Sequence, residues 1–380
     1  MRSLARILRS LAAVCVLVAG VVGPALARQP QRGALPPIRH VFLIVLSSES
    51  YAKAFGADSA APYLAKTLPA QGALLENYYA IGHWALDDYI ALVSGQAPNP
   101  HTQRDCLDVS DFHLYQPALD PNGQALGFGC VYPNLVKTLP DQLEKAGLTW
   151  KGYMEDLDAD ASRDRPVTCT VDRVGKRDLT GIPSASDQYA SEHDPFVYFH
   201  TILDNPARCK AHLDNLDELK TDLRSIATTP DYAFITPNLC NGGHDAPCLG
   251  HDPGGLPKID AFLKAWVPPI THSPAFRKDG LLIITFDSAD GAVPPVDYAA
   301  CCGEKPLSSD PIPPGFRGPG GGKVGAVLLS PFIHARTVSS VPYNHYALLR
   351  TVEDIFDLGH LGYAGQQGLR PFGSDVFSGP

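Results

Sequence analysis

Two nearly continuous apolar runs, at residues 38–46 and 280–286, dominate the hydrophobic pattern of the chain. A strand with one solvated face alternates apolar and polar residues, whereas a strand covered on both faces does not. Both runs therefore predict central, fully buried strands. Shorter apolar stretches predict further strands at residues 149–154, 232–237 and 323–330.

Helical patterns lie between these predicted strands. Residues 139–147 have a proline at the start and a glycine at the end, as capped helices do. Helices are also predicted at 61–75, interrupted near Pro69, and at 258–266 and 342–356, with a short strand at 76–80. Alternation of this kind predicts an α/β fold with a central, mostly parallel sheet and helices on both faces.

The polar segment 156–230 interrupts this alternation. It contains two predicted helices, around 195–205 and over 216–226. We interpret it as an insertion over the sheet, within a single α/β domain spanning residues 38–380.

The stretch His83-Trp84-Ala85-Leu86-Asp87-Asp88, continuing to residue 95, predicts a tight loop followed by a short helix. The N-terminus of a helix presents unpaired N–H groups and the positive end of its dipole, which together suit a phosphate or another anion. A hydroxyl at the first helical position could attack that anion. The residue at this position is Ala85.

The N-terminal segment is typical of a secretory signal. Residues 1–27 combine three arginines, an apolar run and a small-residue cleavage pattern, and a linker at 28–37 follows. Removing these arginines changes the formal charge from −9 to −12. An acidic surface argues against nucleic acid as a partner. No later segment has transmembrane length, so we expect an exported periplasmic or extracellular protein without a membrane span.

Eight cysteines follow the predicted signal segment, an even number that favours disulfides in an exported chain. A zinc site is the alternative, but the chain contains no C-x-x-C pair. Proximity in sequence predicts the pairs Cys106–Cys130, Cys169–Cys209, Cys240–Cys248 and a vicinal Cys301–Cys302.

Several motifs resemble a bacterial phosphoesterase family that contains acid phosphatases and phospholipases C, a branch of the alkaline-phosphatase-like superfamily. The resemblance extends from about Ile38 to the C-terminus. The segments that carry it are 77–80, 82–83, 89–95, 152–156, 193–198, 237–241, 321–325 and 343–354. It implies an alkaline-phosphatase-like sheet and a metal-assisted phosphoryl-transfer site.

The chain departs from the family pattern at the positions that carry this chemistry. The resemblance places the nucleophile at Ala85, and Asp87-Asp88 stand where the family has Pro-Asn. An alanine has no nucleophilic atom. Metal-ligand positions of the family fall on Ser47, Ser48, Asp287 and Ser288, and an expected aspartate is Gly242. Serine is a poor ligand for a hard divalent cation compared with a carboxylate.

Four histidines remain at positions that surround the phosphate in the family, and we expect them to share a pocket with the two aspartates. They are His83, His193, His244 and His345. Asp87 and Asp88 are interpreted as acids in the first turn of a helix, which the dipole favours. A relocated metal site on Asp87, Asp88 and Asp287 is the alternative, although adjacent helical side chains diverge by about 100°.

These observations predict a phosphoesterase-family protein that has lost its hydrolytic chemistry and acts as a binding or interaction protein. Its expected ligand is a phosphate ester or another small anion, or else a protein partner, and no cofactor is expected. The alternative hypothesis is an active metal-dependent ester hydrolase with a rewired site, which would need a divalent metal.

Overall fold

A computed structural model describes residues 35–160, 163, 169, 174–289, 296–305 and 319–378. The predicted signal segment and residues 28–34 of the predicted linker lie outside this part of the chain. Residues 34–380 form one compact unit. In the described part of the chain, no helix is long and apolar enough to cross a membrane.

The centre of this unit is an eight-stranded sheet with the order β11-β2-β10-β9-β1-β8-β6-β7. Its strands are β1 (His40–Leu46), β2 (Ala73–Leu75), β6 (Trp150–Met154), β7 (Leu213–Asn215), β8 (Tyr232–Thr236), β9 (Gly280–Phe286), β10 (Ala326–Leu329) and β11 (Thr337–Ser339). Only β10 runs antiparallel to its neighbours in this sheet. The predicted α/β fold with a mostly parallel sheet is therefore confirmed.

The two strands predicted to be central occupy the middle of the sheet. Every residue of β1 and β9 is buried, and the two pair in parallel from His40 opposite Gly280 to Leu46 opposite Phe286. Because the carboxyl ends of parallel strands meet at one edge, the residues that follow β1 and β9 lie together there.

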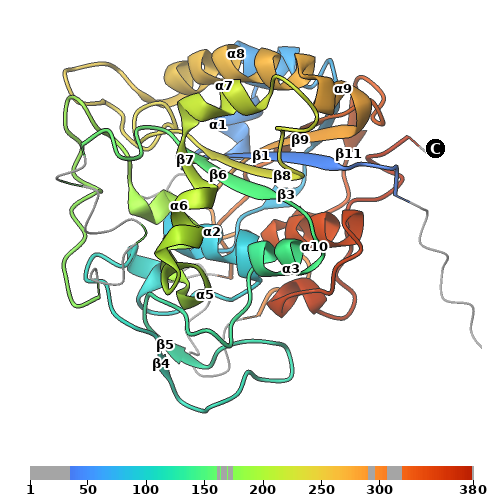
Figure 1. Cartoon of the computed structure of the whole chain (residues 1–380). Helices are drawn as coiled ribbons and strands as arrows, with labels where there is room; N and C mark the ends of the chain where they lie inside the picture. Colours follow the sequence, from blue (N-terminus) through green and yellow to red (C-terminus); the bar gives the residue numbers. More distant parts are fainter. Residues whose placement is uncertain are drawn as a thin grey trace, which may run out of the picture. The chain divides into compact units, whose positions relative to one another are not determined.

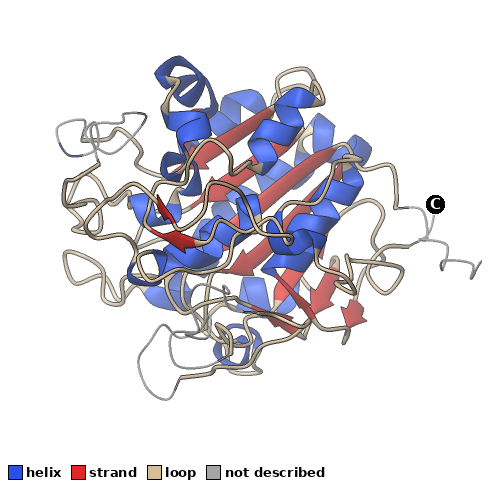
Figure 2. Ribbon diagram, turned by 90° about the horizontal axis from the view of Figure 1, so that it is seen from below, coloured by secondary structure: helices blue, strands red, loops and turns tan. Residues whose placement is uncertain are grey.

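Helices cover both faces of the sheet, as Figure 1 and the turned view in Figure 2 show. One face carries α8 (Gly255–His272) and α9 (Pro274–Asp279), and the other carries α2 (Ala85–Ser94), α3 (Leu139–Lys145) and α10 (His345–Ile355). Shorter helices are α1 (Tyr51–Phe55), α5 (His200–Leu203), α6 (Pro206–His212) and α7 (Leu219–Asp222). Short turns of 3-10 helix include η2 (Thr102–Arg104), η4 (Ser191–His193), η5 (Pro195–Tyr198), η6 (Leu216–Glu218) and η7 (Gly362–Gly365).

Several predicted helices are wrong in extent. The helix predicted at 61–75 is a single π-helical turn, η1 (Tyr63–Thr67), because residues 73–75 pair as β2 with β10 and β11. The helices predicted around 195–205 and 216–226 break into the short pieces η5 with α5 and η6 with α7. Helix α8 begins earlier than expected and continues through Pro268 and Pro269 to His272.

All four predicted disulfides are present: Cys106–Cys130, Cys169–Cys209, Cys240–Cys248 and Cys301–Cys302. The segment 156–230 contributes α5, α6, α7 and the edge strand β7, which pairs with β6. Two small ribbons complete the fold, β3 (Tyr78–Tyr79) with β12 (Tyr343–Asn344) and β4 (His113–Leu114) with β5 (Gly127–Phe128). The β3–β12 ribbon brings the start of α10 beside the segment that leads into α2.

Candidate functional site

Helix α2 begins at the residue that the sequence places in the nucleophile position. Ala85 is its first residue and is buried, and the preceding Trp84 supplies no side-chain cap. The cap comes instead from Asp105, whose Oδ1 accepts a hydrogen bond from the backbone N–H of Leu86 at 2.9 Å. An internal carboxylate therefore occupies the helix N-terminus that would otherwise attract an anion.

The backbone conformation of Asp105 and the disulfide that follows it hold this residue at the start of α2. It follows the turn η2 in a left-handed conformation (φ 51°), and the next residue, Cys106, is disulfide-bonded to Cys130. Burial raises the pKa of Asp105 to about 7, although the N–H groups of Leu86 and Ala85 lower it. Sequence reasoning missed this residue, because its contact with α2 depends on the path of the loop that carries it.

Asp88 is a buried hydrogen-bond acceptor that shapes the loop before α2. Its Oδ1 accepts from the backbone N–H of Ile81 at 2.6 Å and from that of Gly82 at 3.1 Å, and Nε2 of His345 lies 3.3 Å away. Burial raises its pKa well above the usual range, and the neighbouring Asp87 raises it further. Asp88 therefore stabilises the loop before α2 through hydrogen bonds to its backbone. The sequence predicted only a favourable interaction with the helix dipole.

Asp87 differs from Asp88 although the two are adjacent and both fully buried. Neither carboxylate oxygen of Asp87 accepts a hydrogen bond of normal geometry. The group packs against the backbone of Gly82, where an added Cβ would lie 2.2 Å from its Oδ2. Burial raises the pKa of Asp87 well above the usual range, the Asp105 carboxylate raises it further, and contact with Asp88 only partly opposes the rise.

The residues at the family's metal positions lie at the ends of β1 and β9, and we call Ser47, Ser48, Asp287 and Ser288 the strand-end group. Asp287 is its only carboxylate. Oδ2 of Asp287 accepts from the hydroxyl of Ser47 at 3.0 Å, and Oδ1 accepts from the N–H groups of Ser48 at 2.8 Å and Ser288 at 2.5 Å.

The strand-end group does not fit a divalent metal. A hard cation needs several anionic oxygens, and here a single carboxylate is already engaged by three protein donors. The relocated set of Asp87, Asp88 and Asp287 is not preformed either. Among the described residues, these carboxylates do not form a group of three ligand atoms within 4.8 Å of one another.

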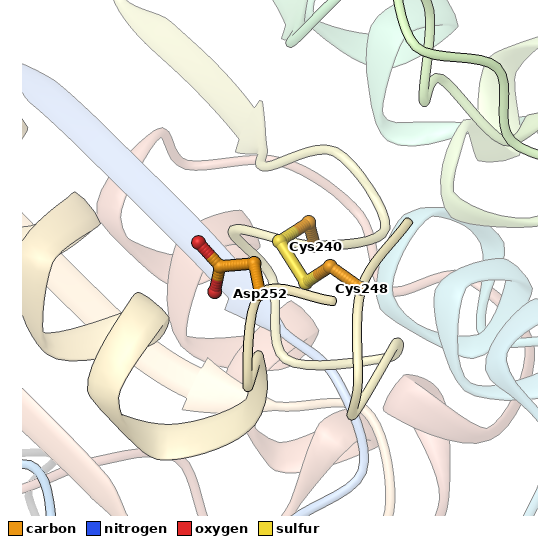
Figure 3. A group of neighbouring side chains, drawn as sticks. All are labelled: Cys240, Cys248 and Asp252. Carbon is orange, nitrogen blue, oxygen red and sulfur yellow. A yellow bond between two sulfur atoms is a disulfide. The ribbon is translucent and has the colours of Figure 1, made fainter. Parts of the chain in front are cut away.

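The described residues contain one group that meets this distance criterion, Cys240, Cys248 and Asp252. Figure 3 shows that its two sulfur atoms are bonded to each other beside the carboxylate of Asp252. Disulfide sulfur is not a thiolate and does not ligate metal as one. The cysteines therefore form disulfides, as predicted over the zinc alternative.

His345 is the first residue of α10 and has a structural role. Its Nε2 donates to the carbonyl oxygen of Asp287 at 2.9 Å, so its Nδ1 accepts from the hydroxyl of Tyr78 at 2.8 Å. Burial lowers the pKa of His345 to about 4. The ring is therefore neutral and fixed between the two ends of the site.

The other three histidines surround the start of α2. His193 lies in η4, stacks on Tyr89 of α2 at 5.3 Å between ring centroids, and meets the ring of His244 at 5.6 Å. Burial lowers the pKa of His193 well below its usual range. His83 is buried edge-to-face against Tyr298, with ring centroids 5.0 Å apart.

His244 is the solvent-facing edge of the site, with 38% of its side chain exposed. Burial alone would lower its pKa, but a hydrogen bond from its ring to Asp245 at 2.9 Å and the carboxylates of Glu192, Asp245 and Asp287 raise it to about 9. At neutral pH this histidine is a cation. It balances only part of the surrounding negative charge.

Two more carboxyl groups belong to the site and were missed by sequence reasoning. Glu192 precedes His193, and burial raises its pKa to about 8, with the Asp105 carboxylate contributing. Glu304 follows the vicinal disulfide; both of its oxygens are buried without a hydrogen bond of normal geometry, and Asp87 raises its pKa further. We call the five carboxyl groups around α2 the helix-end acids; they are Asp87, Asp88, Asp105, Glu192 and Glu304.

The sheet edge, the helix N-terminus and the histidines define an α/β protein with a candidate site at the carboxyl ends of parallel strands. Comparison with known sequences specifies the class: the chain matches the Phosphoesterase family over residues 54–359 and belongs to it. All candidate site residues except Ser47 and Ser48 fall within the matched range.

Two relatives illustrate the family. The chain is 28% identical over 370 residues to a phosphatidylinositol-3-phosphatase of Mycobacterium tuberculosis, covering 96% of this chain and 93% of that protein. It is 25% identical over 327 residues to a probable acid phosphatase of Kluyveromyces lactis, covering 85% of this chain but only 59% of that protein. Among solved structures, a Vibrio parahaemolyticus protein in the alkaline phosphatase superfamily aligns with 91% of this chain and 73% of its own, at 12% identity and a TM-score of 0.49.

Proposed function

We propose that this protein is a phosphoesterase-family member that does not hydrolyse phosphate esters and that acts as an exported binding or interaction protein. The observation that carries the proposal is the start of α2. A methyl group stands in the nucleophile position at Ala85, and the adjacent Leu86 N–H donates to Asp105 instead of to a substrate. A reaction that needs a nucleophile and a bound phosphoryl group has neither there.

The strand-end group supports the same proposal. Metal-assisted phosphoryl transfer needs a cation to neutralise the developing charge, and Asp287 is already satisfied by Ser47, Ser48 and Ser288. We therefore expect removal of divalent metal with EDTA to leave the melting temperature and any ligand binding unchanged. Disulfides and the N-terminal sequence pattern support export.

The test of inactivity is a metal-supplemented assay of the purified protein on phosphomonoesters, phosphodiesters and phospholipids. We expect no turnover above that of a blank without protein, in the wild type or in an Asp217→Asn variant, which changes an exposed acid outside the site. Turnover by the wild type that His193→Ala abolishes would overturn the proposal.

A restoration experiment tests the reason for the inactivity. Ala85→Ser is combined with Ser47→Glu, Ser48→Asn and Ser288→Glu, with and without Asp105→Ala. Because Asp105 holds the helix N-terminus, we expect the four changes alone to restore less metal-dependent phosphatase activity than the five together. Equal activity in both variants would show that Asp105 does not block the anion position.

A further inference from the structure

The helix-end acids leave a set of buried polar atoms without hydrogen bonds of normal geometry. They are both oxygens of Asp87, both of Glu304 and the hydroxyl of Tyr346, although Asp88 lies against Asp87 and the side chain of Asn344 against Glu304. Tyr346 is 1% exposed, and the charges of Glu304, Asp88 and Asp87 act on its hydroxyl. Buried polar groups are normally satisfied, so a set of neighbouring unsatisfied ones indicates a missing partner.

A cationic partner would donate hydrogen bonds to these groups. Burial raises the pKa values of Asp87 and Glu304, and a cation beside them would favour their ionised forms, which only accept hydrogen bonds. In the described part of the chain, no lysine or arginine forms an ion pair with any of the helix-end acids. Among the described residues, the positive charge that acts on Asp105 and Glu192 is that of His244, which is bonded to Asp245. A second anion such as phosphate would increase the repulsion.

The spacing of the acceptors distinguishes among cations. A bare divalent ion needs its ligand atoms close together around one point, and the helix-end acids supply no three such atoms within 4.8 Å. A small organic cation spreads several N–H donors over a wider volume and can reach separated acceptors.

From this arrangement we infer that the site binds a small organic cation carrying N–H donors, a primary ammonium or a guanidinium, between Asp87, Glu304 and Tyr346. The inference rests on the proposed function, because it replaces the anionic substrate of a phosphatase with a ligand of opposite charge. Glu304 accepts one end of the ligand and Asp87 the other, while Asp105 keeps the helix N-terminus closed to anions.

Binding is tested by isothermal titration calorimetry and thermal shift on the full mature chain. The probes are 1,4-diaminobutane, guanidinium, tetramethylammonium, inorganic phosphate and the metals Mg²⁺, Ca²⁺ and Zn²⁺. We expect the diamine or guanidinium to bind and to raise the melting temperature. Tetramethylammonium is a cation without N–H donors, and we expect it to bind at least tenfold more weakly. Phosphate should neither bind nor compete.

Two isosteric variants locate the ligand. Asp87→Asn and Glu304→Gln keep the shape of the side chains and remove the charge, and each should raise the dissociation constant at least tenfold. Asp217→Asn, which changes an exposed acid, should leave it unchanged. The melting temperature of each unliganded variant shows whether it is folded.

Each alternative outcome overturns the inference. Binding of a divalent metal that Asp87→Asn abolishes would assign the site to an ion. Binding of phosphate by the wild type would show that the anion position is open. Absence of amine and guanidinium binding at millimolar concentrations would show that the acids are only protonated core groups. The proposed lack of hydrolysis is decided separately, by turnover.

Discussion

The two halves of the site differ in how they treat buried charge. In the strand-end group, Asp287 receives hydrogen bonds from Ser47, Ser48 and Ser288, although the hydroxyl of Ser288 itself is buried without a partner; we call this half closed because its carboxylate is satisfied. Among the helix-end acids, Asp87 and Glu304 receive none of normal geometry. In the first half, protein donors occupy the carboxylate of Asp287, where the family resemblance places a metal. The second retains unsatisfied groups, as a binding site does before its ligand arrives.

The largest expected consequence of this difference is the effect of pH on stability. Burial raises the pKa of Asp105 to about 7 and that of Glu192 to about 8, from about 4 in the unfolded chain. The folded state therefore keeps these protons at higher pH. The stability that they contribute is fully present below about pH 4 and is lost as the pH rises through 7 to 8.

We accordingly expect the free energy of unfolding to be lower at pH 9 than at pH 5, by an amount on the order of 7 kcal/mol. Urea unfolding across this range measures it. The double variant Asp105→Asn with Glu192→Gln should flatten the profile, because neither new group titrates. In the double variant, a remaining slope of the free energy of unfolding against pH would come from the neighbouring titratable groups, which are Asp87, Asp88, Asp287 and His244. A wild-type protein that is more stable at pH 9 would contradict the description of the helix-end acids.

Adjacent residues allow the next test. Asp88 accepts hydrogen bonds from the N–H groups of Ile81 and Gly82, so Asp88→Ala leaves two buried donors unpaired. We expect the free energy of unfolding to fall by about 3 kcal/mol. The measurement is the urea midpoint at pH 6. A loss below about 1 kcal/mol would mean that the loop before α2 does not depend on this carboxylate.

Asp87 should behave in the opposite way. Because its carboxylate has no donor, Asp87→Asn removes a buried charge without breaking a hydrogen bond of normal geometry. We expect a gain of about 1 kcal/mol in the free energy of unfolding, larger at pH 8 than at pH 5, where the carboxyl is protonated. Differential scanning calorimetry at the two pH values checks both the sign and the difference. Destabilisation comparable to that of Asp88→Ala would remove the distinction between the two aspartates.

The sequence allowed the strand-end half to be predicted better than the helix half. Strands β1 and β9 are continuous apolar runs, so the strand ends before Ser47 and Asp287 followed from local pattern, while the family resemblance placed the two residues in one site. The start of α2 at Ala85 followed from local pattern as well. The short strand β2 did not, since its pairing with β10 and β11 joins segments far apart in sequence.

The acids that complete the site could not be predicted for the same physical reason. Asp105 lies in a loop and accepts a hydrogen bond from the start of α2. Glu304 is distant from Asp87 in sequence, yet the charge of Asp87 acts on it in the folded protein. Neither lies in an element with a periodic pattern. The sequence also predicted that four histidines share one pocket, but it did not distinguish their roles: His345 is a fixed neutral support and His244 a solvent-facing cation.

Ser47→Ala gives the smallest expected effect and tests the closed half. It removes one of three donors to Asp287, and the N–H groups of Ser48 and Ser288 remain. We expect a loss of about 1 kcal/mol in the free energy of unfolding, and no change in binding of 1,4-diaminobutane. Chemical denaturation and calorimetry measure the two quantities on the same sample. If Ser47→Ala weakened diamine binding as strongly as Asp87→Asn does, the two halves would form a single ligand site, because the hydroxyl of Ser47 contacts only the strand-end group.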